Sequence, residues 1–304
     1  MAKYDVAIVG GGPAGLVAAR YAQHARLRVA MVTPSLGGKV NYSFALRGMK
    51  PIDTVWGANL VHRFEKVIKA KLDDHFALEA VKIERREDGF EVMMGGGKRI
   101  EARAVILTTG ASARRLYIAG EKEYWGRGLS FSAISHAPLF AGRDVAVVGG
   151  GERALLATLE LAPIAKRVYL VAAHPQRMAE LPIAEQVAKH SNVVTFQNWE
   201  VQQILGDDFV TGISLVGVNG EIRQIPVEGV FIQFALVPSN EMVRDLVDLD
   251  RDGHVIVNHR CETSVPGLFA AGDVTSVHAE QVPVAIGEGA KAALSAWEYL
   301  STHP

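Results

Sequence analysis

The chain has 304 residues, of which 49% are apolar, and its 32 basic residues are nearly balanced by 33 acidic ones. This length suits two domains that each bury a core, and the balanced charge argues against a nucleic-acid partner. No apolar run approaches the length of a membrane span, and the first residues lead directly into an expected strand rather than a signal peptide, so we predict a cytoplasmic protein without a membrane segment.

The chain begins with a pattern that predicts a pyrophosphate-binding turn. A short apolar strand, Asp5–Val9, runs into a Gly-x-Gly-x-x-Gly motif, and a helical pattern follows at once. Gly10 allows the tight turn, Gly12 lets backbone N–H groups reach the phosphates, and Gly15 lets the helix pack closely on the strand. Pro13 suits the first turn of that helix. The motif alone is a weak signal, but a strand before it and a helix after it strengthen it.

The next elements are consistent with a βαβ unit. Residues 28–33 read as its second strand, where an NAD-binding unit would place an acid for a ribose hydroxyl and this chain has Thr33. Gly37 and Gly38 predict a second flexible turn. Residues 54–72 have helical spacing, and residues 76–103 alternate between apolar and polar positions, which favours antiparallel strands.

A second strand–glycine–helix unit follows later in the chain. After a buried strand that ends at Gly110 and a loop-rich connector, residues 144–148 run into Gly149-Gly-Gly151-Glu-Arg-Ala154, which fits Gly-x-Gly-x-x-Ala. We expect a helix over residues 154–164, a strand over residues 167–171 and several short strands up to residue 236. Two such units are far more specific than one, and they predict an α/β protein with a doubled dinucleotide-binding fold.

The last part of the chain carries an acid after a glycine. Residues 267–274 predict a strand that closes on Gly-Asp, and residues 281–296 predict a long helix. On the pattern alone, Asp273 is either a helix cap or a cofactor ligand. Cys261 ends an expected strand over residues 254–261 and reads as a buried small hydrophobe. As the only cysteine, it excludes an intramolecular disulfide, and no metal site is predicted.

Three stretches, residues 108–115, 120–128 and 142–151, resemble the low-molecular-weight thioredoxin reductases and their FAD-dependent relatives. The motifs occur in the family's order and spacing over the full length. The resemblance implies two Rossmann-like, three-layer ββα domains and a homodimer with a thioredoxin-like or ferredoxin-like redox partner. The implied FAD domain has two pieces, residues 1–116 and 241–304, and the second dinucleotide domain, residues 117–240, is inserted between them.

The resemblance also implies which residues meet the FAD. Asp273 would accept a hydrogen bond from the ribityl chain, and the amides of Gln281 and Val282 would face the pyrimidine edge of the isoalloxazine. A helix N-terminus there would stabilise the negative charge that a flavin gains on reduction. The other implied contacts are Gly10, Gly12, Pro13, Ala14 and Gly15 around the pyrophosphate, Gly37 and Gly38 beside the flavin, Thr109 and Gly110 at the domain crossover, and Gly272 beside Asp273.

The redox motif of the family is replaced. Members carry Cys-x-x-Cys-Asp in the connector, and the matching catalytic positions here are Ser132, Ser135 and His136. A hydroxyl cannot cycle between thiol and disulfide, so disulfide exchange is chemically excluded at this site. A designed change and a natural loss of the cysteine pair would give the same pattern. On sequence alone we interpret His136 as a solvated loop histidine.

The second dinucleotide site departs from the family's NADPH site. A 2′-phosphate carries about two negative charges at neutral pH and requires guanidinium groups, which residues 171–174, Val-Ala-Ala-His, do not offer. No acid stands there for NADH either, and Glu280 replaces an arginine of the family. The pyrophosphate loop itself is retained. Its expected contacts are Gly149, Gly151, Arg153 and Ala154, with Arg177 as a further phosphate contact.

Three interpretations follow from these departures. In the first, the chain is a diflavin-type disulfide oxidoreductase, or a variant of one, with a second FAD in the pyridine-nucleotide site. In the second, it is a pyridine-nucleotide-independent, ferredoxin-linked flavin reductase. In the third, it is a catalytically silent flavoprotein that acts as a sensor or binding partner. In all three NADPH is expected to be a poor electron donor.

Overall fold

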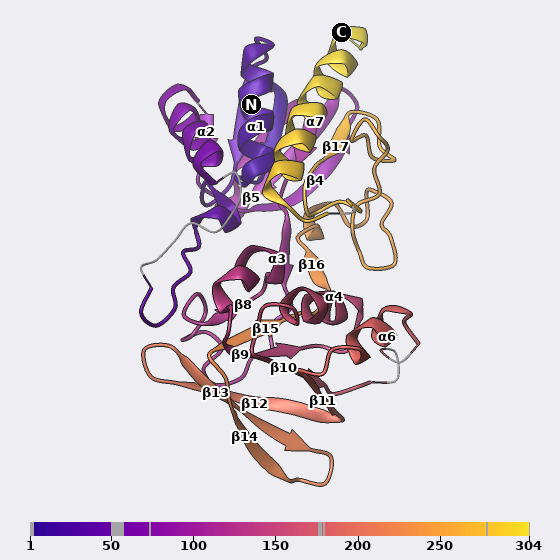
Figure 1. Ribbon diagram of the computed structural model, residues 1–304. Helices are drawn as coiled ribbons and strands as arrows, with labels where there is room; N and C mark the ends of the chain where they lie inside the picture. Colours follow the sequence, from indigo (N-terminus) through magenta and orange to yellow (C-terminus); the bar gives the residue numbers. More distant parts are fainter. Residues whose placement is uncertain are drawn as a thin grey trace. The chain divides into compact units, whose positions relative to one another are not determined.

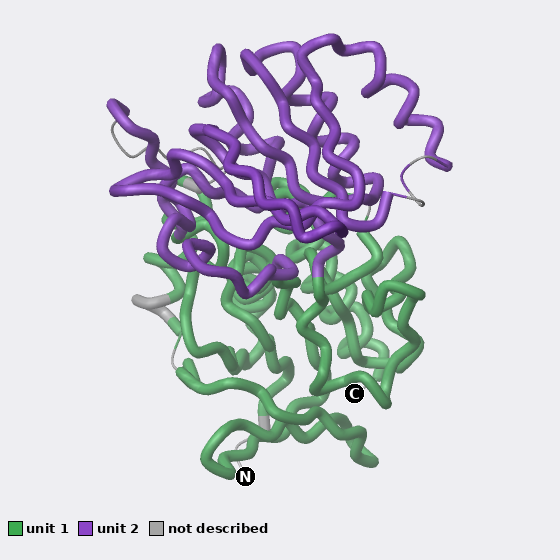
Figure 2. Tube along the Cα trace, turned by 90° about the horizontal axis from the view of Figure 1, so that it is seen from below, with its two compact units in different colours: residues 1–41, 55–112, 237–304 green, residues 42–54, 113–236 purple. Residues whose placement is uncertain are grey.

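The computed structural model describes residues 3–49, 58–72, 74–175, 178, 180–277 and 279–303. It divides the chain into two compact units, which Figure 2 shows in different colours. Unit 1 comprises residues 1–41, 55–112 and 237–304, and unit 2 comprises residues 42–54 and 113–236. The described residues 42–49 thus cluster with unit 2, whereas the division expected from sequence placed them in the first piece.

The centre of unit 1 is a mostly parallel sheet in the strand order β3-β2-β1-β6-β5-β4. Its strands are β1 (Lys3–Val9), β2 (Val29–Val32), β3 (Asp74–Phe76), β4 (Ala80–Arg86), β5 (Gly89–Met94), β6 (Arg99–Leu107) and β17 (Leu268–Ala270). One edge of β6 pairs antiparallel with β5 through its first half and parallel with β17 through its second half. The antiparallel strands expected within residues 76–103 are therefore confirmed.

Three helices pack on one face of this sheet. They are α1 (Pro13–His24), α2 (Ala58–Lys71) and α7 (Val282–Thr302), and Figure 1 shows α1 between the other two. The strands are apolar on both sides: Ile8 belongs to the core cluster on the helical face, and Val9 belongs to the cluster on the opposite face, with Val243 and Val255. This double burial explains why β1 reads as a continuous apolar run.

Shorter elements complete unit 1 and its connections. They are η1 (Gly38–Asn41), η2 (Gly95–Gly97), β7 (Ala111–Ala113), β16 (Leu236–Pro238) and η4 (Glu241–Val243). Strands β7 and β16 pair as a small sheet of their own. Within the described part of the chain, we find no helix with both the length and the apolar character that a membrane span needs.

Unit 2 repeats the layered plan. Its parallel sheet has the order β11-β10-β9-β15-β8, and a separate antiparallel sheet has the order β12-β13-β14. The strands are β8 (Leu129–Ser130), β9 (Asp144–Val148), β10 (Arg167–Ala172), β11 (Val193–Gln197), β12 (Trp199–Gly206), β13 (Val210–Gly217), β14 (Ile222–Pro226) and β15 (Gly229–Ile232). The helices are α3 (Ala133–His136), η3 (Ala137–Phe140), α4 (Glu152–Leu161) and α6 (Ile183–Ala188). The predicted fold, two three-layer α/β units, is confirmed.

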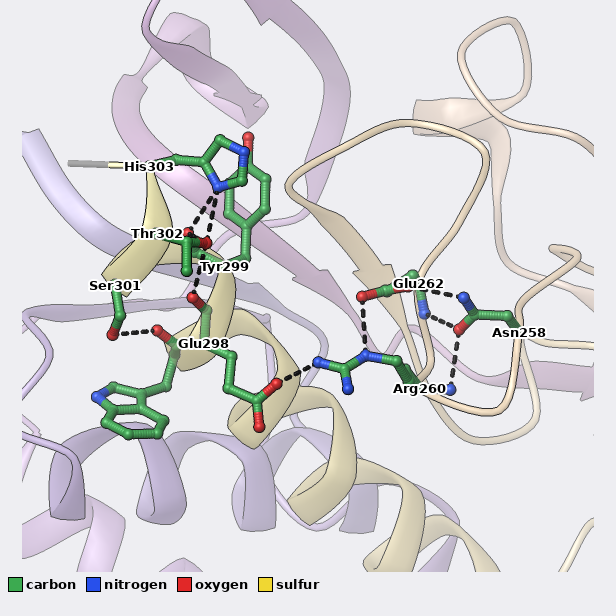
Figure 3. Close-up of polar contacts among 9 residues, drawn as sticks. Asn258, Arg260, Glu262, Glu298, Tyr299, Ser301, Thr302 and His303 are labelled. Atoms are coloured by element: carbon green, nitrogen blue, oxygen red, sulfur yellow. Dashed lines mark hydrogen bonds and ion pairs between the residues drawn. The ribbon is translucent and has the colours of Figure 1, made fainter.

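The strand expected over residues 254–261 is wrong. Cys261 lies in a tight turn with φ +62° and is buried. The side chain of Asn258 organises this turn, because its Oδ1 accepts hydrogen bonds from the backbone N–H groups of Arg260 and Glu262 at 2.9 and 3.1 Å. Arg260 pairs in turn with Glu262 and with Glu298 on α7, as Figure 3 shows. Local side-chain hydrogen bonds therefore override the alternating pattern here.

Candidate functional site

In the first glycine loop of unit 1, backbone atoms occupy the space that side chains at Gly10 and Gly15 would need. A Cβ on Gly10, where φ is +113°, would lie 2.3 Å from the carbonyl oxygen of Thr108, and one on Gly15 would lie 2.1 Å from the carbonyl oxygen of Gly10. A Cβ on Gly12 would meet nothing within 4 Å. Gly12 is also the N-cap residue of α1, followed by Pro13. The loop is therefore tightly packed inward and open at the helix N-terminus, as a pyrophosphate cradle requires.

A second loop lies directly on this cradle. The backbone N–H of Gly37 donates to the carbonyl oxygen of Gly11 at 2.8 Å, and a Cβ on Gly38 would lie 3.0 Å from the Cα of Gly12. Both Gly37 and Gly38 have positive φ, and Asn41 closes the loop by donating to the carbonyl oxygen of Leu36 at 2.7 Å. The structure thus brings the two glycine turns predicted from sequence together.

A third loop approaches from the end of β17. A Cβ on Gly272, where φ is +76°, would lie 3.3 Å from the Cβ of Ala14, and the N–H of Gly272 donates to Glu288 Oε2 at 2.9 Å. Asp273 follows and accepts a hydrogen bond from Lys39 Nζ at 2.7 Å. Asp273 caps no described helix, since the N-cap residue of α7 is Gln281. The helix-cap interpretation is therefore wrong.

The remaining residues that were expected near the first site lie around the end of β6 and the start of α7. Thr109 Oγ1 donates to the carbonyl oxygen of Ser239, and the N–H of Ser239 donates to the carbonyl oxygen of Gly110 at 2.9 Å. Gln281 and Val282 form the N-cap and first position of α7, and no acid lies in the helix's first turn. These residues leave an electropositive helix end that suits an anionic group.

These three loops fit a dinucleotide such as FAD. The test is steric: a side chain on Gly10 or Gly15 would collide with backbone, whereas the position of Gly12 is open on the side where a phosphate would approach. When bound there, FAD would supply electron and hydride transfer, which no side chain of this chain provides.

The second glycine loop, in unit 2, follows the same plan. A Cβ on Gly149 would lie 2.5 Å from the carbonyl oxygen of Gln233 and 3.0 Å from the Cβ of Ala154. A Cβ on Gly151 would meet nothing within 4 Å, and Gly151 is the N-cap residue of α4. The helix begins at Glu152 rather than at Ala154 as expected, which places an acid in its first turn.

Ala172 and the backbone of His174 flank this second loop. A Cβ on Gly150 would lie 3.1 Å from the carbonyl oxygen of His174 and 3.7 Å from the Cβ of Ala172. Ala172 is buried at the end of β10, where a nucleotide ribose is recognised in this fold. Arg153 lies in the first turn of α4 and is half-buried. Arg177, the other expected phosphate contact, lies outside the described residues.

Gln233 is a candidate that sequence reasoning missed. Its neighbours Ile232 and Phe234 pack against the antiparallel sheet, so strand alternation directs Gln233 to the face that α4 covers. Only 6% of Gln233 is exposed, and its Nε2 has no hydrogen-bond partner among the described residues. It follows β15, next to Gly149, where the strand order of the sheet reverses. A polar residue inside the apolar run of residues 229–236 was the available signal.

The two serines of the connector contact each other. Ser132 Oγ donates a hydrogen bond to Ser135 Oγ at 3.0 Å, across the start of α3, whose N-cap residue is Ser132. Ile134 between them is 57% exposed, so this turn lies at the surface of unit 2. The geometry keeps the close approach that a cysteine pair needs, although a hydroxyl pair has no redox chemistry of its own.

His136 is not the solvated loop histidine that the sequence suggested. His136 is the last residue of α3. Its ring stacks on that of Phe44 with the ring centroids 4.1 Å apart, and its Nδ1 lies 2.7 Å from Ser130 Oγ. Burial lowers the pKa of His136 to about 4, opposed by a hydrogen bond to the backbone of Ser132. This lowered pKa favours the neutral imidazole of His136 at pH 7.

This depressed pKa predicts acid sensitivity. Between pH 6.5 and 4 the unfolded chain binds a proton at His136 that the folded chain does not, so the free energy of unfolding falls as the pH falls. We expect His136 to contribute a loss of about 2 kcal/mol between pH 7 and pH 5. Urea unfolding at both pH values should show this loss for the wild type and not for His136→Gln. Equal pH dependence of the two proteins would contradict the burial of the ring.

Comparison with known proteins agrees with this architecture. Residues 4–289 match the family model described as "Pyridine nucleotide-disulphide oxidoreductase". The thioredoxin reductase of Streptococcus pyogenes MGAS5005 is 32% identical, with a TM-score of 0.89 and coverage of 99% of both chains. That of Giardia duodenalis is 28% identical, with a TM-score of 0.87 over 99% of this chain and 100% of that one.

Two longer proteins are also similar. The "NADH dehydrogenase" of Bacillus subtilis (strain 168) is 35% identical over 298 residues, which are 98% of this chain and 58% of that protein. An alkyl hydroperoxide reductase component of Staphylococcus epidermidis is 34% identical over 299 residues, 98% of this chain and 59% of that protein. The chain thus spans about three-fifths of the length of these curated relatives. Taken with the two glycine loops, these matches show that the chain belongs to the pyridine nucleotide-disulphide oxidoreductase family, in its thioredoxin-reductase-like class.

Proposed function

We propose that the chain is an FAD-dependent oxidoreductase whose first glycine loop holds FAD and whose second holds a dinucleotide other than NADPH, in the leading form a second FAD. One observation carries this proposal. Gly12 and Gly151 are equivalent open positions at the starts of α1 and α4, while the rim of the second loop presents Ala172 and the backbone of His174. The phosphate cradle is thus present twice, and the side chains that select NADPH are absent from the sequence of that rim.

Each part of the first site has a task in this proposal. The N–H groups at the start of α1 would hold the pyrophosphate, and Asp273 would accept a hydrogen bond from a ribityl hydroxyl. The amides at Gln281 and Val282 would stabilise negative charge at the pyrimidine edge of the flavin. Because Ser132 and Ser135 cannot form a disulfide, electrons would leave by another route, and a ferredoxin-like partner of a homodimeric protein would fit that requirement.

A second candidate function is a single-flavin reductase that takes electrons from NADH. Similarity to the Bacillus subtilis protein named "NADH dehydrogenase" favours it. The rim residues Ala172 and Ala173 argue against it, since neither offers a carboxylate to a ribose hydroxyl. If neither a nicotinamide nor a one-electron donor supports turnover, the chain is the catalytically silent flavoprotein.

The proposal predicts poor reduction by NADPH. Each charge-assisted contact to the 2′-phosphate is worth about 1.5–3 kcal/mol, so losing two weakens binding by at least about a hundredfold. Anaerobic stopped-flow mixing with micromolar NADPH should therefore reduce the flavin slowly and incompletely. The double variant Ala173→Arg/His174→Arg should accelerate this reaction and leave the reaction with NADH unchanged. Rapid, complete reduction of the wild type by NADPH would refute the proposal for the second site.

A further inference from the structure

An ion pair lies across the first glycine loop. Lys39 Nζ is 2.7 Å from Asp273 Oδ2, and the two residues come from loops that both touch the cradle. Lys39 follows Gly38, whose Cβ would lie 3.0 Å from the Cα of Gly12, and Asp273 follows Gly272, whose Cβ would lie 3.3 Å from the Cβ of Ala14. The pair is therefore held beside the helix N-terminus at which a pyrophosphate would bind.

Two carboxylates, those of Asp273 and Glu288, lie at this position. The side chain of Asp273 is 18% exposed, so water screens its carboxylate only in part. A second carboxylate, that of Glu288, accepts a hydrogen bond from the N–H of Gly272 at 2.9 Å. A dinucleotide pyrophosphate brings about two further negative charges to the same place. Lys39, whose side chain is 50% exposed, is the cation in contact with Asp273.

We propose that Lys39 is the counter-ion that lets the first site accept an anionic dinucleotide. Its ammonium neutralises Asp273, so that a carboxylate can remain in the cradle as a hydrogen-bond acceptor without repelling the phosphates. This inference rests on the proposed function, in which the dinucleotide is FAD. Lys39 is thus a positioning and charge-compensating residue, and its effect passes through Asp273 rather than through the phosphates.

The test is a double-mutant cycle on FAD binding. FAD is removed from the purified protein, and the dissociation constant for added FAD is measured by flavin fluorescence at low and high salt. We expect Lys39→Met to bind about tenfold more weakly, because an uncompensated unit charge several Å from a phosphate has about this effect. Asp273→Asn measures the loss of the carboxylate alone, and adding Lys39→Met to it should weaken FAD binding by no more than about twofold further, since the charge that Lys39 neutralises is then absent. Salt should shrink the defect of the single variant.

A matched control is available in the same unit. Lys82 Nζ lies 2.6 Å from Glu84 Oε1 on strand β4, which is not part of the cradle. Lys82→Met should therefore leave FAD affinity unchanged. Circular dichroism and thermal unfolding check that each variant folds. Wild-type affinity in Lys39→Met would overturn the inference, and so would a tenfold loss when Lys39→Met is added to Asp273→Asn. A wild type that takes up no FAD would overturn the proposed function as well. Failure of the proposed function is thus distinguished from failure of the Lys39 inference alone, in which the wild type binds FAD.

Discussion

Replacing Gly12 by alanine is expected to abolish flavin binding at the first glycine loop and leave the fold intact. A methyl group at Gly12 meets no atom of the described residues within 4 Å, and φ there is −74°, which alanine adopts readily. The cost in free energy of unfolding should not exceed about 1 kcal/mol, the usual effect of alanine at a helix N-cap. The same methyl would occupy the place where a pyrophosphate approaches the backbone. Purified Gly12→Ala should therefore be folded and carry only the flavin of the second loop, about one per chain.

The equivalent change in unit 2 separates the two sites. Gly151→Ala should keep the first flavin and lose the ligand of the second loop, because a Cβ there also meets nothing within 4 Å. Gly15→Ala provides the contrast, since its Cβ would lie 2.1 Å from a backbone oxygen and should destabilise the protein itself. Gly287→Ala, in an open position on α7, is the neutral control. A Gly12→Ala protein with a full complement of flavin would contradict the assignment of the first loop.

Restoring two cysteines at Ser132 and Ser135 is expected to create a redox-active disulfide. The two Oγ atoms are already 3.0 Å apart, and a disulfide requires about 2.0 Å between sulfurs, a small adjustment in an exposed turn. We expect the double variant to yield two additional titratable thiols on reduction and to gain activity towards thioredoxin. The wild type should show neither property.

Two controls accompany this experiment: the native Cys261 and the single variant Ser132→Cys. Burial raises the pKa of the Cys261 thiol to about 11, so a thiol reagent should not modify the native wild type. Ser132→Cys alone should add one reactive thiol and no disulfide. If the double variant stays reduced under oxidising conditions, the connector is not shaped for a disulfide and the link to the family's redox motif fails.

The parts of the fold that follow from local pattern could be predicted from sequence. Both glycine loops and the strands before them could be predicted from the spacing of their glycines. That spacing reports the structure because a side chain at Gly10 or Gly149 would collide with neighbouring backbone. The strand at residues 254–261 was predicted wrongly, because the hydrogen bonds of the Asn258 side chain decide the backbone there. Alternation of apolar residues does not report such local competition.

The environment of single side chains was harder to predict. The burial of His136 depends on Phe44, which is distant in sequence, and its depressed pKa follows from that contact. The ion pair of Lys39 was also not predictable from local pattern, because its partner Asp273 lies 234 residues further along the chain. Gln233 was overlooked because it becomes a candidate site residue only through its position beside Gly149, where the strand order reverses. Such long-range pairings come from topology rather than from spacing.

In the proposed function both glycine loops bind dinucleotides, and NADPH is the natural ligand of neither. The most direct measurement is the visible spectrum of the protein purified in excess FAD, followed by denaturation and a count of released flavin per chain. We expect FAD rather than FMN, at a ratio close to two flavins per chain that falls to one in Gly151→Ala. A ratio near one in the wild type, unchanged by Gly151→Ala, would contradict it.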